Sequence, residues 1–183
     1  MKIPAISGSA RHDSTNTALL KALQAMAPVT MEIEVFHGIA ELPVFSPDLE
    51  GPLTPHLVRS FAQKLQACDG VLIASPEYVR GIPGGLKNAI DWLVSGDEVV
   101  HKPIALGHAS HRGDDMLAAL RMVLSTVSSQ FNADLFFRLS LMKETPDAVQ
   151  AMVNAPENRP TAVAFLHAFA AFCQAGDSNA AIA

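Results

Sequence analysis

Short apolar runs alternate with longer amphipathic segments along the chain. Runs of four to seven residues that are apolar, or that alternate apolar with polar residues, are typical of β-strands. Five such runs are Lys2–Ser7, Thr30–Phe36, Val71–Ala74, Pro103–Gly107 and Ala133–Phe137. The second run alternates apolar with charged residues, which predicts a half-exposed strand near a sheet edge. The third is apolar throughout, which predicts a strand buried on both faces.

The segments between these runs carry apolar residues at helical spacing. The sequence predicts helices over 18–26, 55–67, 83–93 and 116–131, and helical structure from about 145 to 174. Pro156 and Pro160 are expected to break this last segment in two, and 177–183 is expected to form a loose tail. Leu57, Phe61 and Leu65 are expected to form the buried face of the helix over 55–67.

Strands that alternate with helices fold into a parallel sheet, because right-handed crossovers place each helix over one of its faces. A chain of 183 residues is long enough for one such domain with a full core. We therefore predict a single α/β domain over residues 1–183, a doubly wound five-stranded parallel sheet in the order 2-1-3-4-5 with helices on both faces. In this order the loops that follow the first, third and fourth strands lie side by side.

Composition narrows the expected partners. Hydrophobic residues make up 49% of the chain, and the net charge of −5 comes without any run of Lys or Arg. These features argue against a nucleic-acid surface or an anionic membrane as the main partner. We expect a cytoplasmic protein, because no stretch reaches the roughly 18 apolar residues of a membrane span and no signal-peptide pattern is present. Cys68 and Cys173 lack metal or redox spacing and are expected to be reduced, buried thiols.

The loop after the first strand has the character of an anion site. Residues 8–17 combine small and hydroxyl-bearing side chains with Arg11, just before a predicted helix. Free amides and the positive end of a helix dipole attract anions, and a guanidinium suits phosphate. The loop contains neither a dinucleotide nor a triphosphate motif, so a monophosphate is the better ligand. The alternative is that Ser14 and Asn16 merely cap the helix.

The loops after the third and fourth strands complete this edge of the sheet. The stretch 75–85 has three glycines, one carboxylate and one phenol ring, and its bare backbone would suit a flat heteroaromatic ligand. His108, His111, Asp114 and Asp115 in the other loop could be read as a metal cluster. We favour a solvated loop and helix start over that reading, because Asp114 and Asp115 suit a helix dipole. One ligand could contact all three loops.

Two motifs resemble the NADPH-dependent FMN reductase family of flavodoxin-like proteins, which includes bacterial quinone, azo-dye and chromate reductases. The stretch 8–11, with Ser14 and Asn16, is similar to the family's phosphate loop. The stretch 75–92, which reads SPEYVRGIPGGLKNAIDW, is similar to its flavin loop. Element order and length agree with the family over roughly residues 2 to 153.

The resemblance implies that FMN binds noncovalently across the three loops. The residues implied for its phosphate are Ser9, Arg11, Ser14, Asn16 and Thr17. Those implied for its ring are Pro76, Glu77 and Tyr78, with Val79 and Arg80 beside them and with His108 and Ser110 at the far edge. Val79 occupies a position that is usually Asn in the family, and 108–115 lacks the several glycines that members commonly carry there.

The function that the resemblance implies is an FMN-dependent NAD(P)H oxidoreductase. NADPH or NADH would deliver a hydride through FMN to a quinone-like or other small-molecule acceptor, including free flavin, without a protein nucleophile or a metal. A flavodoxin-like electron shuttle and a flavin-free binding or regulatory relative remain as alternatives. The family also pairs its subunits, which implies a homodimer or homotetramer. Trp92 is expected either in the core or at such a contact.

Overall fold

The computed structural model describes residues 1–11 and 13–180, with side chains up to residue 176. Within these residues five strands form one parallel sheet in the order β2-β1-β3-β4-β5. The strands are β1 (Lys2–Ser7), β2 (Glu32–Phe36), β3 (Val71–Ala74), β4 (Ile104–His108) and β5 (Phe131–Arg138). The predicted fold class and strand order are confirmed, and β2 is the half-exposed edge strand that its alternation indicates.

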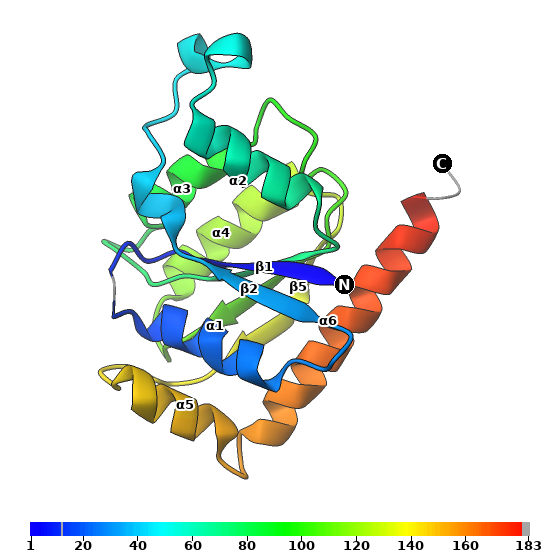
Figure 1. The fold of residues 1–183 in the computed structure, drawn as a ribbon. Helices are drawn as coiled ribbons and strands as arrows, with labels where there is room; N and C mark the ends of the chain where they lie inside the picture. The colour runs from blue at the N-terminus through cyan, green and yellow to red at the C-terminus, as the bar shows by residue number, and fades with distance from the viewer. Residues whose placement is uncertain (12, 181–183) are drawn as a thin grey trace.

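Helices cover both faces of the sheet (Figure 1). In the described part of the chain they are α1 (Thr15–Met26), α2 (His56–Gln66), α3 (Gly84–Asp91), α4 (Asp114–Val127), α5 (Pro146–Asn154) and α6 (Arg159–Ala180). The helices α1, α5 and α6 pack on one face, where Leu19, Leu23 and Phe169 are fully buried. The helices α2, α3 and α4 pack on the other face around Leu65, Leu86 and Leu120. The carboxyl-terminal helices therefore share a core with the first helix.

The long segment between β2 and α2 contains three short 3₁₀ helices: η1 (Gly38–Glu41), η2 (Pro47–Leu49) and η3 (Gly51–Leu53). Figure 1 shows η2 and η3 projecting from the body of the molecule. Trp92 holds the base of this segment, since its indole N–H donates to Pro43 O at 2.7 Å and its ring meets Phe45 edge-on. Trp92 is buried. Of the two positions expected for it, the core and a subunit contact, this agrees with the core.

The predicted helix over 116–131 is wrong at its end. Helix α4 stops at Val127, because Ser128 takes an extended backbone and its hydroxyl donates to Lys102 O at 2.8 Å. Phe131 already belongs to β5 and pairs with Ile104. Val127 and Phe131 keep helical spacing, so the pattern alone favours a longer helix. Pairing with β4 decides the matter in favour of the strand.

Smaller corrections concern other helix ends and faces. Leu57 is 47% exposed, and Val58 takes the buried position on α2 instead. Pro83 precedes α3 as its N-cap rather than opening it. Pro160 is the second residue of α6, where its missing N–H breaks no helical hydrogen bond, so the break lies at 155–158. Helix α6 continues to Ala180, so the tail predicted from 177 is wrong up to that residue, and 181–183 lie outside the described residues.

Both cysteines are buried and neither is part of a disulfide, as predicted. Burial raises the pKa of the Cys68 thiol, and the nearby charge of Lys102 partly offsets this effect. Among the residues that the structure describes, no helix combines the length and the apolar character needed to cross a lipid bilayer.

Candidate functional site

Strand register brings the three polar loops to one level at the carboxyl edge of the sheet. Ser7 on β1 pairs with Ala74 on β3, and Ala74 pairs with Gly107 on β4. Gly8 then lets the first two loops approach closely, because a Cβ at this position would lie 2.5 Å from Ser75 Oγ. The loops that the sequence singles out are therefore neighbours in space.

The amino terminus of α1 forms the first half of the site. Ser14 holds the N-cap position with an extended backbone, but its hydroxyl accepts no hydrogen bond from the first turn of the helix. The side chains of Ser9, Ser14, Asn16 and Thr17 are buried around this terminus. Beside them lies a hollow of about 530 Å³, lined in part by the cationic residues Arg11 and Lys21. Hydroxyl groups, a helix amino terminus and positive charge are the features of an anion site.

Two of these residues have partners within the protein. Asn16 Oδ1 accepts the backbone N–H of Ala109 at 3.2 Å and so links α1 to the loop after β4. The hydroxyls of Thr17 and Ser7 lie 2.7 Å apart. Asn16 and Ser14 thus do not act as simple side-chain caps of α1, and that alternative is wrong.

A tight hairpin after β3 joins the two halves of the site. Tyr78 and Gly81 exchange two backbone hydrogen bonds, and the residues between them, Val79 and Arg80, have φ of 51° and 59°. Two successive positive φ values are the signature of a type I′ turn. The hairpin brings Tyr78 OH to 3.4 Å from Ser9 Oγ, so the phenol of the third-strand loop contacts the first loop.

Glu77 and Arg80 connect this hairpin to the start of α4. The N-cap of α4 is Gly113, which has no side chain to satisfy the free amides, and Glu77 Oε2 accepts the N–H of Met116 at 3.0 Å instead. Arg80 Nε lies 2.6 Å from Asp115 Oδ2. This hydrogen bond and its charge lower the pKa of Asp115 and raise the pKa of Arg80. Glu77 therefore has a structural partner in the first turn of α4.

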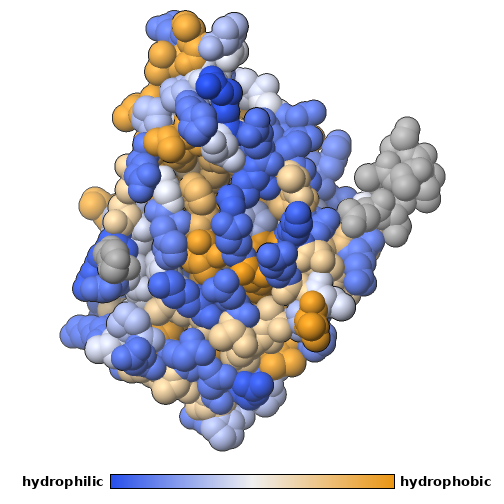
Figure 2. All heavy atoms as spheres, viewed as in Figure 1, coloured by the Kyte–Doolittle hydropathy of each residue, from blue (hydrophilic) through white to orange (hydrophobic). Residues whose placement is uncertain are grey.

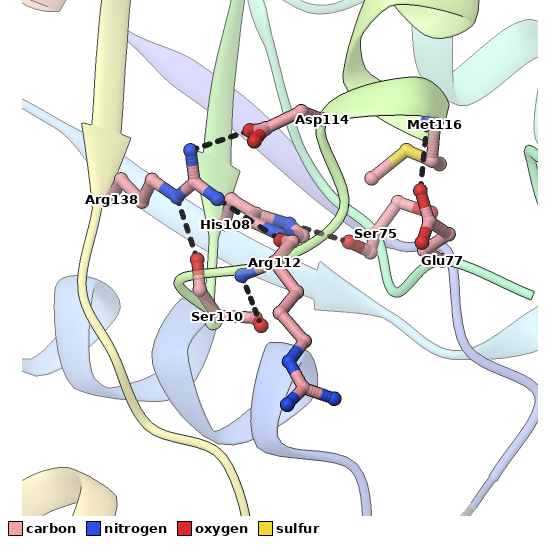
Figure 3. A network of polar contacts seen from close by, with 8 residues as sticks. All are labelled: Ser75, Glu77, His108, Ser110, Arg112, Asp114, Met116 and Arg138. Carbon is pink, nitrogen blue, oxygen red and sulfur yellow. Dashed lines mark hydrogen bonds and ion pairs between the residues drawn. The ribbon is translucent and has the colours of Figure 1, made fainter. Parts of the chain in front are cut away.

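The loop after β4 closes the second half of the site. A cavity of about 250 Å³ lies between residues from α1, Pro76 and Glu77 from the hairpin side, and His108 and Ser110 from this loop. Arg138, at the end of β5, donates to Ser110 O at 2.6 Å and to Arg112 O at 3.1 Å (Figure 3). Sequence reasoning missed Arg138; the available signal was a cation at the carboxyl end of the fifth predicted strand.

The four residues of the alternative metal reading have separate partners. Asp114 pairs with Arg138 at 2.8 Å, and Asp115 pairs with Arg80. His108 is buried against two carbonyl groups, while the exposed His111 contacts Ser140 Oγ. No group of three or more potential metal ligands forms among the described residues.

Val79 has a backbone conformation that is unfavourable for its side chain. A β-branched residue at φ 51° is an outlier, whereas Asn tolerates this conformation, which supplies a backbone reason for the Asn that the family usually has here. We expect Val79→Asn to raise the free energy of unfolding by about 1 kcal/mol, the lower end of the left-handed penalty. Chemical denaturation measures this. The matched control is Val29→Asn, because Val29 is equally exposed without a positive φ; equal effects of the two substitutions would contradict the strain.

An open parallel sheet in this order, with a helix amino terminus beside a cationic hollow and a second cavity at the carboxyl edge of the strands, is typical of the flavodoxin-like class of mononucleotide-binding proteins. The chain belongs to the NADPH-dependent FMN reductase family, whose model matches residues 1–138.

Known relatives place the chain more closely. It is 34% identical to a quinone reductase of Escherichia coli over 113 aligned residues, and the aligned region covers 60% of each chain. It is 42% identical to a 2-hydroxy-1,4-benzoquinone reductase of a Burkholderia species over 92 aligned residues. The aligned region covers 50% of this chain and 49% of the relative. The chain thus spans about half to three fifths of the length of these relatives.

A solved structure extends the similarity over nearly the whole chain. The flavoenzyme NAD(P)H:(acceptor) oxidoreductase FerB from Paracoccus denitrificans superposes with a TM-score of 0.70. Its sequence identity is 28%, with 97% of both chains covered. The similarity therefore includes α5 and α6, which lie beyond the family match.

Proposed function

We propose that this protein is an FMN-dependent NAD(P)H oxidoreductase that reduces quinone-like acceptors. The observation that carries the proposal is the two-part site, in which an anion-binding helix terminus and a ring cavity are joined by the contact between Tyr78 and Ser9. The names of the quinone reductases and of the flavoenzyme to which the chain is similar support it.

The residues at the site fit FMN. The phosphate would lie at the amino terminus of α1, with the hydroxyls of Ser9 and Ser14, the amides of Asn16 and Thr17, and Arg11 as donors. The ring would enter the cavity beside Pro76, Glu77, His108 and Ser110, with Tyr78 at its edge. Val79 and Arg80 would act through the conformation of the turn, because the side chain of Val79 is fully exposed and Arg80 is paired with Asp115.

FMN, when bound, supplies a ring that accepts a hydride from a nicotinamide and passes it to a second acceptor. The role of the protein would be to bind FMN and to orient its ring. The helix terminus and Arg11 would neutralise the phosphate, and Pro76 and Glu77 would line the cavity for the ring. Glu77 is engaged by Met116 N, so it positions the loop over 76–81 against α4 rather than exchanging a proton with substrate.

The acceptor would be a small soluble quinone. The protein itself would be a cytoplasmic homodimer or homotetramer. Exposed apolar side chains support the association: Val44, Leu53 and Leu57 are 82%, 66% and 47% exposed along the projecting segment and the start of α2. Figure 2 shows apolar side chains gathered at this projecting end. Light scattering on the purified protein tests the oligomer, and a monomer would refute it.

The activity is tested on purified protein by three measurements in order. We expect a flavin absorption spectrum, or its appearance when FMN is added to colourless protein. Anaerobic NADPH or NADH should then bleach that spectrum, and a benzoquinone should restore it. Slow bleaching by both nicotinamides would favour the electron shuttle, and protein that refuses FMN would favour the flavin-free relative.

The phosphate position predicts a selective effect of Arg11→Ala. We expect this substitution to weaken FMN binding by about 1.5–3 kcal/mol, the range for a hydrogen bond to a charged group. Riboflavin has no phosphate, so its affinity should not change. Fluorescence titration with both flavins measures this, and Arg59→Ala serves as control because Arg59 on α2 lines neither hollow of the site. Equal loss of FMN and riboflavin affinity would contradict the placement.

A further inference from the structure

Arg112 places a positive charge at the ring cavity, the hollow of about 250 Å³ between α1, the hairpin and the loop after β4. The residue is exposed and is one of those that line this cavity. In the described part of the chain, every hydrogen bond of Arg112 involves its backbone. Figure 3 shows its guanidinium pointing away from the polar network around it. Because a guanidinium is always charged in proteins, a full positive charge is available here.

Other charged side chains around the ring cavity have partners of their own. Arg80 is paired with Asp115 at 2.6 Å. Arg138 is paired with Asp114 at 2.8 Å. The carboxylate of Glu77, which lines the cavity, accepts a backbone N–H of α4 at 3.0 Å. These three carboxylates are therefore engaged, and the exposed guanidinium at the cavity is available to an anion from outside the chain.

The backbone beneath this guanidinium is held in place. Arg112 N donates to Ser110 Oγ at 2.9 Å, and Arg112 O accepts from Arg138 Nη2 at 3.1 Å. The next residue, Gly113, forms the N-cap of α4 with φ of 99°. A binding group on an ordered turn loses little backbone entropy when a ligand arrives. The planar fork of a guanidinium can also hold two oxygens of one oxyanion at once.

This anion differs from the phosphate of FMN. The hollow proposed for that phosphate is lined by Arg11 and Lys21, and it shares none of its lining residues with the ring cavity. The phosphate would therefore have cations of its own. The charge of Arg112 would act on a second ligand, which approaches the ring cavity from solvent.

We propose that Arg112 determines which acceptors this protein prefers, by binding an anionic substituent on the acceptor ring. The proposal rests on the proposed function and adds a substrate class to it: quinones that carry a carboxylate, a sulfonate or an ionised hydroxyl group. Charge-assisted hydrogen bonds from the guanidinium would hold such a substituent at the exposed side of the cavity. Neutral quinones of the same size lack this contact and are the poorer substrates.

Anion binding is tested first, on protein without flavin. The probes are naphthalene sulfonate and naphthalene sulfonamide, which have nearly the same shape but differ in charge. We expect the wild type to bind the sulfonate about tenfold more tightly, as for a hydrogen bond to a charged group, and Arg112→Met to lose this difference. Calorimetric titration measures both affinities. Equal affinities in the wild type, or a difference that persists in Arg112→Met, would overturn the proposal whether or not FMN binds.

Acceptor choice is tested by steady-state kinetics on FMN-loaded protein with NADPH. The acceptors are benzoquinone sulfonate, which is anionic, and methylbenzoquinone, which is neutral. We expect Arg112→Met to raise the KM of the sulfonate about tenfold and to leave the KM of the methyl compound unchanged. Arg112→Lys, which keeps the charge but not the planar fork, should restore part of the preference. The control is Arg59→Met, because Arg59 is an exposed arginine on α2 that does not line the ring cavity.

Three results would overturn the assignment to the acceptor. An equal change for both quinones would mean that the charge acts on the flavin ring. A higher KM for NADPH, with both quinones unaffected, would mean that the anion belongs to the dinucleotide. The same loss of preference in Arg59→Met would mean that only the net charge of the protein matters. Failure of the wild type to bind FMN would instead refute the proposed function, and the titration without flavin would still decide whether Arg112 binds anions.

Discussion

Replacing Phe169 with alanine is expected to lower the free energy of unfolding by about 3–5 kcal/mol. Phe169 lies on α6, has no exposed surface and stacks on Phe165 with the ring centroids 6.5 Å apart. Its ring also reaches the turn before β3, since a Cβ at Gly70 would lie 3.1 Å from the Phe169 ring. Truncation would leave a cavity between α6 and the sheet. Denaturant unfolding followed by circular dichroism measures the effect.

The same experiment examines whether residues 1–183 form the single domain that the sequence predicts. His167→Ala is the control, because His167 is exposed on the same helix and its loss should change stability by less than about 0.5 kcal/mol. A single transition that moves as a whole in Phe169→Ala is the expected outcome. Equal stabilities of the two variants, or a separate early transition, would show that α6 is a peripheral element.

Gly8→Ala is expected to disturb the site strongly. The new Cβ would lie 2.5 Å from Ser75 Oγ, 2.7 Å from Ser75 Cβ and 3.0 Å from Leu86. Such overpacking costs about 1–3 kcal/mol and forces the backbone to move. Because Gly8 and Ser75 begin the two loops that we propose to hold the phosphate and the ring of FMN, we also expect FMN affinity to fall at least about tenfold, which is 1.4 kcal/mol.

Gly84→Ala is the matched control for this prediction. Gly84 opens α3 in the same region, and a Cβ there would meet nothing within 4 Å. We expect it to stabilise the protein by about 0.4–1 kcal/mol through the unfolded state. Thermal unfolding and FMN titration of both variants decide the matter. A Gly8→Ala protein with unchanged stability and affinity would mean that the two loops are not in contact.

Apolar patterning was sufficient for most of the fold. The bounds of β1 and β3 match the predicted runs Lys2–Ser7 and Val71–Ala74, because short apolar runs flanked by polar loops have few other uses in a chain of this composition. The end of α4 was wrong because helical spacing continues through Phe131. The apolar pattern along the chain contains no information that Phe131 pairs with Ile104 on β4.

The residue types of the site were also visible in the sequence, because each polar loop follows a buried strand. What each side chain does was not visible. Asn16 could be read as a helix cap, yet it accepts from Ala109, and Val79 could be read as an ordinary loop residue, yet it occupies a strained turn. These roles depend on distances between segments that are far apart along the chain.

The sequence by itself determined the parallel sheet, its strand order and the placement of three polar loops at one edge, because hydrophobic period and crossover handedness are local rules. Only the tertiary structure decided that Glu77 caps α4, that Arg138 holds the loop after β4, and that His108 faces two carbonyl groups. The physical reason is that a hydrogen bond is defined within about 3 Å in space, and no periodicity along the chain encodes which distant groups meet at that distance.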